Sequence, residues 1–206
     1  TRAHHGDVGG MTPGSMPAGA TEIYQEGLRI PMVRLANDGE LDEDILSLLL
    51  ANVRNADQRR ADLRAQLAAT ERATDRLREL VDDHGRGTVE SAFDSVIEYS
   101  RKRVESELEA MPDGVYTARD FLEGDGVTDE EIPIEVAVAI DGPTVDVDFT
   151  GTAGQLTGNM NAPLAVAKSA VYFVLRAVTD PEIPRNHGCY QPISIEVPEG
   201  SLLDPA

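Results

Sequence analysis

Apolar residues in the middle of the chain recur with the spacing of α-helices. Leu41, Ile45, Leu48 and Leu49 recur at helical spacing, which predicts a short amphipathic helix over 41–52. A narrow apolar seam then continues to His84-Gly85, which predicts a long helix that Asn55 or Asp57 caps. The seam residues are Leu63, Leu67, Thr70, Thr74, Leu77 and Val81. A third helix is predicted over 89–108, and we interpret the two long helices as a hairpin that protrudes or packs on another subunit.

The pattern changes on both sides of these helices. Strands are predicted over 134–140, 144–149 and 193–197, and a helix over 163–178. Glycine and proline punctuate the first 30 residues, a strand is expected over 30–35, and residues 37–39 read as a turn. We therefore predict an α+β fold with mixed strands and a long helical hairpin, forming part of a larger multi-domain subunit. The segments are 1–56 (Gly/Pro-rich site loop, strand and short helix), 57–111 (helical hairpin) and 112–206 (an α+β segment, incomplete at its C-terminus).

Charge and cysteine content limit the classes of partner. The 206 residues carry a formal net charge of −19, which argues against nucleic acid and against anionic membrane surfaces. No apolar run reaches the length of a membrane span. Cys189 is the single cysteine, so no disulfide can form within the chain, and a reducing cytoplasm is the expected compartment.

The motif His4-His5-Gly6-Asp7 is the strongest candidate for chemistry. Two imidazoles and a carboxylate are the ligand types of Zn, Mn or Fe sites, and the glycines that follow permit close approach of the backbone. The alternative is a surface turn in which Asp7 caps its own backbone. Because neighbouring side chains of an extended segment face opposite sides, one histidine is expected to bind the ion, and further ligands must come from elsewhere.

Two other groups are candidates for acid–base and carbonyl chemistry. Glu22, Tyr24 and Glu26 alternate, so an extended backbone would point both carboxylates into one polar cleft; the alternative is solvated surface charge. Asn159 and Asn161 precede a predicted helix N-terminus, which suits an anion or a carbonyl oxygen, and a capped turn is as good an interpretation.

The remaining motifs carry weaker signals. His187 and Cys189 form only a weak signal for a thiol nucleophile. His84 stands at a helix end, where the dipole favours it, so it reads as structural. The glycine-rich stretches match neither a phosphate-binding loop nor a dinucleotide fingerprint, so nucleotide binding is not indicated.

Several motifs together resemble the hydantoinase B/5-oxoprolinase family. They are His4–Met11, Pro13–Pro17, Thr21–Gly27, Leu48–Arg54, Asp113–Tyr116, Asp148–Thr152, Gln155, Gly158–Pro163, Ile183–Gly188 and Pro198–Ser201. The resemblance covers essentially the whole chain in order. Members of this family are longer at both ends, so the chain is interpreted as an internal fragment.

The resemblance implies a function as well as a fold. It implies ATP-dependent hydrolysis of a small cyclic amide, hydantoin or 5-oxoproline, in a hetero-oligomer with a hydantoinase A-type ATPase subunit that uses the ATP. In the acetone carboxylase branch it implies a divalent metal (Mn, Zn or Fe), with His4 or His5 as ligand and Asp7 as ligand or support. An acetone carboxylase-like subunit and a non-catalytic fragment that only assembles with a partner are the alternatives.

Overall fold

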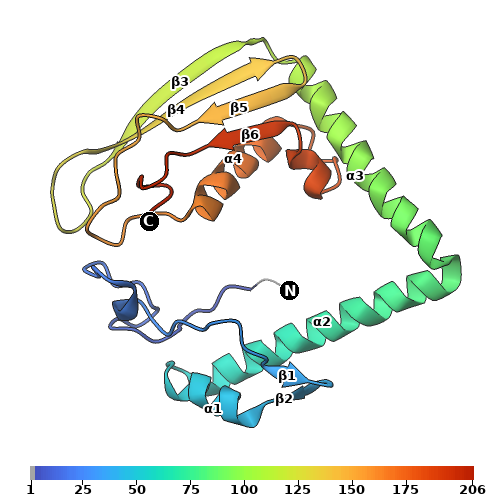
Figure 1. The fold of residues 1–206 in the computed structure, drawn as a ribbon, viewed down its shortest axis with the longest axis vertical. Coiled ribbons are helices and arrows are strands. Elements are labelled where there is room, and N and C mark those ends of the chain that lie inside the picture. The colour runs from blue at the N-terminus through green and yellow to red at the C-terminus, as the bar shows by residue number, and fades with distance from the viewer. Residues whose placement is uncertain (1–2) are drawn as a thin grey trace. The chain divides into compact units, whose positions relative to one another are not determined.

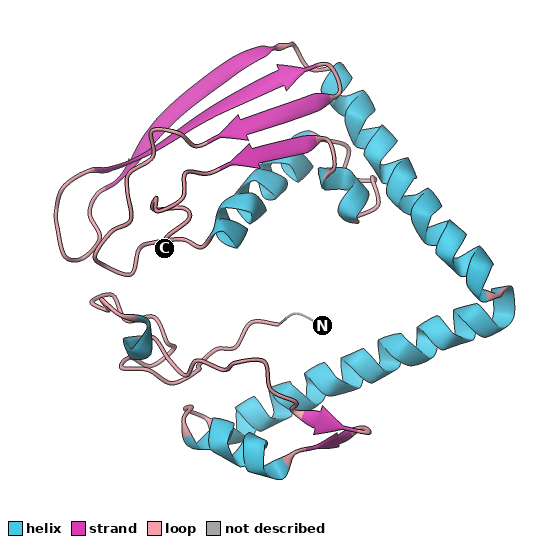
Figure 2. Ribbon diagram, viewed as in Figure 1, coloured by secondary structure: helices cyan, strands magenta, loops and turns pink. Residues whose placement is uncertain are grey.

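The chain folds into two compact units, residues 1–86 and residues 87–206, in a computed structural model that describes residues 3–206 (Figure 1). Helices and strands are mixed in one chain, which confirms the α+β class (Figure 2). Within residues 3–206, no helix is long and apolar enough to cross a bilayer. The first predicted long helix belongs to the first unit and nearly all of the second to the second unit. The division of the sequence into three segments stays a prediction.

The first unit begins with irregular chain rather than with a strand. Its first helical turn is η1, the 3-10 turn Ile23–Gln25, and its two strands are short, β1 (Ala36–Asn37) and β2 (Glu40–Leu41). The strands pair as a hairpin whose turn residues, Asp38 and Gly39, both have positive φ, which confirms the predicted turn. The predicted strand over 30–35 is wrong, since these residues form no strand and Pro31 has no N–H to donate to a sheet.

Two helices complete the first unit. The helix α1 (Glu43–Ala51) begins where Asp42 Oδ1 accepts hydrogen bonds from the backbone N–H groups of Asp44 and Ile45, at 3.1 and 3.0 Å. The helix α2 (Ala56–His84) follows after a short connection. Asn55 precedes it in a left-handed conformation and makes no side-chain capping bond, so the predicted cap is not formed. Leu46 of α1 is fully buried, whereas Leu77 and Leu80 in the second half of α2 are exposed.

The second unit holds a four-stranded sheet. Its elements are α3 (Arg86–Glu109), β3 (Gly114–Leu122), β4 (Ile132–Asp141), β5 (Thr144–Asp148), α4 (Leu164–Val178), η2 (His187–Tyr190) and β6 (Ile193–Glu196). The strand order is β3-β4-β5-β6, antiparallel except for the parallel pair β5/β6. The helix α4 makes the crossover between these parallel strands (Figure 2). The predictions for β4, β5, α4 and β6 are confirmed to within a few residues.

The nine-residue edge strand β3 was not predicted. Eight of its nine residues are exposed. Since both faces of the strand meet water, its sequence lacks the alternation of apolar and polar residues that marks a half-buried strand.

The core of the second unit lies between the sheet, α3 and α4. Its buried residues are Val104, Leu108, Val145, Val147, Phe149, Leu175, Ile183 and Cys189. The helix α3 is fastened to residues 183–190 by the fully buried Ser100, whose hydroxyl donates to the Pro184 carbonyl at 3.0 Å and accepts from Asn186 Nδ2 at 2.7 Å. Cys189 is fully buried in this core while His187 is exposed, which supports a packing role for the thiol.

Candidate functional site

The Asp7 carboxylate organises the glycine-rich loop of the first unit. Oδ1 accepts hydrogen bonds from the N–H groups of Gly9 and Arg54 at 2.9 and 3.1 Å. Oδ2 accepts from the Gly14 N–H at 3.0 Å and from Arg54 Nη1 at 2.9 Å. These donors hold the pKa of Asp7 well below its ordinary value, with the backbone N–H groups of Arg54 and Gly9 the largest causes. Asp7 is therefore an ionised, buried carboxylate around which residues 7–14 are wrapped.

Arg54, in the connection between α1 and α2, holds the same loop from the other side. Its Nη1 also donates to the carbonyl oxygens of Gly9 and Thr12, at 3.2 and 3.1 Å, and its Nη2 donates to the Gly10 carbonyl at 2.8 Å. We call Arg54 with Asp7 and these three carbonyls the Arg54 clamp. The clamp joins groups more than 40 residues apart in sequence.

Side chains and close backbone contacts fix the rest of the loop. The Ser15 hydroxyl accepts from the Val8 N–H and donates to the Gly9 carbonyl, both at 2.8 Å. Gly9 and Gly10 have φ values of 92° and 81°, and a Cβ on either would lie about 2.5 Å from a backbone oxygen, of Asn52 or of Glu26. Only glycine fits at these positions, because the backbone adopts a left-handed conformation and leaves no room for a side chain.

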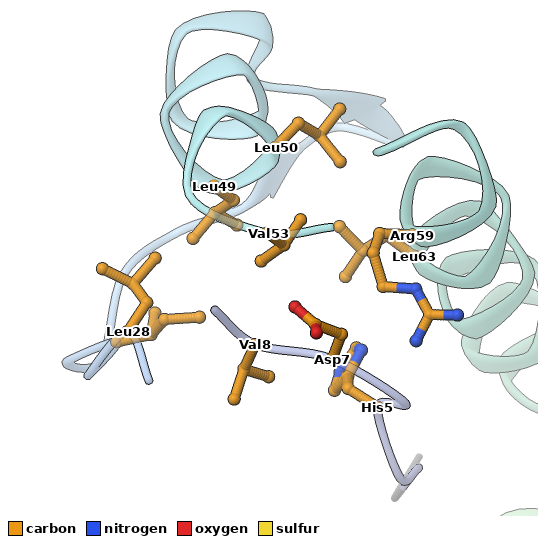
Figure 3. A pocket seen from close by; sticks show the side chains of 10 residues that line it. His5, Asp7, Val8, Leu28, Leu49, Leu50, Val53, Arg59 and Leu63 are labelled. Atoms are coloured by element: carbon orange, nitrogen blue, oxygen red, sulfur yellow. The ribbon is translucent and has the colours of Figure 1, made fainter. Parts of the chain in front are cut away.

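A small pocket of about 60 Å³ lies beside the motif (Figure 3). Its walls are mostly apolar, with His5, Asp7 and Arg59 among the residues that line it; the others are Val8, Leu28, Ile30, Leu49, Leu50, Val53 and Leu63. Arg59 of α2 is nine-tenths buried, and its Nη2 lies 3.1 Å from Asp62 Oδ2. The pocket thus places an imidazole, a carboxylate and a guanidinium around one apolar space.

The motif supplies a partial set of metal ligands. His4 is exposed and His5 half-buried, and neither imidazole has a hydrogen-bond partner within residues 3–206, so both have free nitrogens. The Asp7 carboxylate already accepts four hydrogen bonds. No group of three or more His, Cys, Asp or Glu side chains in the described chain could hold a metal ion. The imidazole nitrogens are therefore open to a ligand and the Asp7 oxygens are already engaged, and the metal-ligand role of His4, His5 and Asp7 stays a prediction.

Glu22 and Glu26 flank a turn rather than lie along a strand. Residues 23–25 form the 3-10 turn η1, so the strand-like alternation that would place Glu22, Tyr24 and Glu26 on one face is absent. Gln25 Oε1 accepts from the N–H groups of Thr21 and Glu22, at 2.7 and 3.3 Å. Both glutamates are exposed. Their catalytic role stays a prediction.

Asn159 and Asn161 lie in a loop before α4, in the second unit. The Asn161 amide accepts from the Leu156 N–H at 2.8 Å and donates to the carbonyls of Leu156 and Gly158, each at 2.9 Å. The buried Asp125 ties the same loop to residues 127–128 by accepting from the N–H groups of Val127, Thr128 and Gly158. Asn161 therefore makes the bonds of a capped turn, and a direct role in catalysis stays a prediction.

Sequence reasoning missed Arg54 and Ser15, which contribute most of the side-chain hydrogen bonds that hold the loop besides those of Asp7. Arg54 lies within a stretch that carries the family resemblance, but its sequence distance from the histidines hid the contact. A Ser among glycines and prolines reads as an ordinary turn residue.

Comparisons with known proteins agree with this architecture. The sequence profile described as Hydantoinase B/oxoprolinase matches residues 1–206. The chain is 32% identical to 5-oxoprolinase 1 of Arabidopsis thaliana, covering 100% of this chain and 18% of that protein. It is 34% identical to the B-type subunit of a candidate D-/L-hydantoinase from a Pseudomonas species, covering 100% of this chain and 37% of that protein.

Two solved structures share the fold. The ATP-dependent caprolactamase of Pseudomonas jessenii superposes with a TM-score of 0.88 at 32% identity, over 96% of this chain and 34% of that one. A nucleotide-free acetone carboxylase superposes with a TM-score of 0.90 at 20% identity, over 98% of this chain and 28% of that one, which is a likeness of fold alone. The chain spans well under half the length of each of these relatives. A profile match over every residue shows that the chain belongs to the hydantoinase B/oxoprolinase family.

Proposed function

We propose that this chain acts in the ATP-dependent hydrolysis of a cyclic amide, hydantoin or 5-oxoproline. The observation that carries the proposal is the loop of residues 4–15, in a chain that matches the hydantoinase B/oxoprolinase profile throughout. There, two imidazoles that have no hydrogen-bond partner in the described part of the chain adjoin a carboxylate that is fixed by the Arg54 clamp. Relatives named 5-oxoprolinase and ATP-dependent caprolactamase support a cyclic amide as the substrate class.

The proposed chemistry is divided between two subunits. A hydantoinase A-type ATPase partner would transfer the γ-phosphoryl group of ATP to the amide oxygen, since this sequence has no nucleotide-binding motif of its own. This chain would receive the activated ring. One water would add to the ring carbon and the ring nitrogen would leave as the amine, which opens the C–N bond and leaves an acyl phosphate; a second water would hydrolyse the acyl phosphate to the carboxylate and free phosphate. The name of the Pseudomonas relative, which describes one subunit of a hydantoinase, is consistent with such a hetero-oligomer. A reducing cytoplasm suits a chain with one cysteine.

The residues would have separate roles. His4 and His5 would offer a neutral imidazole nitrogen, to a metal ion or to the attacking water. A bound Mn, Zn or Fe ion would polarise the carbonyl oxygen and lower the pKa of a water molecule. We retain Glu22 and Glu26 as candidates for acid–base transfer, and Asn159 and Asn161 as candidates for holding a carbonyl oxygen.

Two alternatives belong to different classes. A carboxylase of the acetone type would consume bicarbonate and form a C–C bond, and the likeness of fold to acetone carboxylase leaves this open. A subunit without catalysis would associate with the ATPase partner and support neither reaction.

The test is ATP-dependent ring opening by the chain, in its complete subunit, purified with its ATPase partner. Hydantoin, 5-oxoproline and caprolactam would be offered as substrates, with acetone plus bicarbonate as the competing reaction. We expect ring-opened product and ADP in step with one of the cyclic amides. His4→Ala should lower both turnover and bound metal, measured by elemental analysis. Carboxylated acetone as the only product, or no product with any substrate, would refute the proposal.

A further inference from the structure

The lone pairs of Asp7 are fully used within the protein. A carboxylate has about four acceptor positions, two on each oxygen. Four N–H groups occupy them at 2.9 to 3.1 Å, and two of the four belong to Arg54. A metal ion could take Asp7 only by displacing one of these charge-assisted or backbone bonds. The carboxylate is thus placed to hold the loop rather than to bind a ligand.

The bonds from Arg54 to the backbone carbonyls also require an arginine. The guanidinium reaches three carbonyl oxygens, of Gly9, Gly10 and Thr12, in addition to Asp7. Arginine presents five donors in a fixed planar fork, whereas lysine is a point charge with three donors. No lysine could make this set of bonds. The side chain is 39% exposed, so it is held here by these bonds rather than by burial.

The histidines are joined to this clamp through a short backbone. Asp7 follows His5 by two residues, and Arg59 lies against the intervening Gly6, where its Nη1 would be 3.1 Å from a Cβ. A carboxylate fixed at both oxygens sets the direction in which the chain leaves residue 7. The imidazoles of His4 and His5 lie only three and two residues before this fixed point.

We propose that Arg54 is a positioning residue for the imidazoles of His4 and His5, acting through Asp7, which is itself not a metal ligand. The inference rests on the proposed function for the metal, and it assigns to Arg54 a role in metal affinity without metal contact. Residues that orient ligands commonly change metal affinity about 10- to 100-fold when replaced.

The experiment compares Arg54→Lys with Arg60→Lys in the complete subunit assembled with its partner. Arg60 also pairs with a carboxylate, Glu43, at 3.2 Å, but on the exposed surface of the same unit, so it is the matched control. Affinity for Mn²⁺, Zn²⁺ and Fe²⁺ is measured by competition with a chelator. Hydrogen–deuterium exchange of residues 8–15 is measured in the same samples without metal.

We expect Arg54→Lys to exchange faster over residues 8–15 and to bind metal about 10- to 100-fold more weakly, while Arg60→Lys behaves as wild type. Asp7→Asn should have a similar effect, and the double variant Asp7→Asn/Arg54→Lys should be no weaker than either alone, because both changes open one clamp. Additive losses would mean that Arg54 and Asp7 act on the metal site independently, so that Arg54 does not act through Asp7, and would overturn the inference. So would metal affinity in Arg54→Lys equal to that of wild type.

Failure of the proposed function gives a different result. A wild-type complex that binds none of the three ions overturns the metal role and this inference together. A complex that binds metal and opens the ring, with Arg54→Lys unchanged in affinity, overturns the inference alone.

Discussion

Replacing Gly188 with alanine tests how closely α3 packs on the rest of the second unit. A Cβ at position 188 would lie 2.0 Å from the carbonyl oxygen of Ile97 and 2.9 Å from its carbonyl carbon. Both are backbone atoms of α3, which cannot rotate away as a side chain can. Relief of the clash therefore requires η2 to move away from the helix by roughly 1 Å, well beyond what a packed interior tolerates without loss.

The expected cost follows from the contacts that this movement would break. Over-packing in a well-packed interior costs about 1–3 kcal/mol. The separation also stretches the bonds of Ser100 to Pro184 and Asn186, each worth about 1 kcal/mol net. We expect Gly188→Ala to lower the free energy of unfolding by about 3–5 kcal/mol, which corresponds to a fall in Tm of roughly 6–20 °C for a chain of this size.

The assay is thermal unfolding followed by circular dichroism, with hydrogen exchange of residues 96–104 as a local readout. Gly154→Ala is the matched control, since no atom lies within 4 Å of a Cβ there. The control should keep the wild-type Tm or exceed it slightly, because alanine restricts the unfolded chain. A Gly188→Ala protein with wild-type Tm and exchange would refute the described contact between η2 and α3.

The remaining predictions concern one buried hydroxyl and one carboxylate. Ser100→Ala should cost about 1–3 kcal/mol in urea unfolding because it removes both hydrogen bonds of a fully buried hydroxyl, to Pro184 and Asn186, whereas Ser95→Ala, on the exposed side of the same helix, should stay within about 0.5 kcal/mol; equal effects would contradict the buried bridge. The Asp7 pKa is lowered in the folded state, so its stabilisation is present above its unfolded value of about 3.9 and is lost as pH falls toward the folded value. Urea unfolding measured at successively lower pH below about 4 should therefore show a steeper loss of stability in wild type than in Asp7→Asn, and equal slopes would argue that the carboxylate is not held as described.

Much of the fold could be predicted because its elements carry local signals. The apolar spacing in 41–52 and 89–108 repeats every three or four residues, and the predicted strands over 134–140 and 144–149 likewise rest on patterns that act within a few residues. The strand β3 lacked such a signal, since its neighbours in the sheet lie elsewhere in the sequence and both its faces are exposed. The stretch 30–35 is the reverse case. Its apolar residues match the pattern of a strand, but the structure forms no strand there.

The candidate site divides in the same way. Imidazole and carboxylate chemistry could be read from His4, His5 and Asp7, because residue type alone carries it. The hydrogen bonds that occupy the Asp7 oxygens could not be predicted from the sequence, because two of the four donors belong to Arg54, 47 residues away. The alternative interpretation is a turn in which Asp7 caps its own backbone, and Asp7 does accept such a bond from the Gly9 N–H. Arg54 itself offered no local signal of its role.

The Arg54 clamp also has a consequence for the order in which the chain acquires structure. During synthesis the histidine motif emerges before Arg54, so the bonds that shape it wait for a residue some 40 to 50 positions later. Closing so long a loop is slow compared with forming a single helix turn. Residues 4–15 should therefore be made before α1 and α2 but become ordered only after the connection between these helices has formed. A mature histidine geometry would then report that the connection between α1 and α2 is already in place.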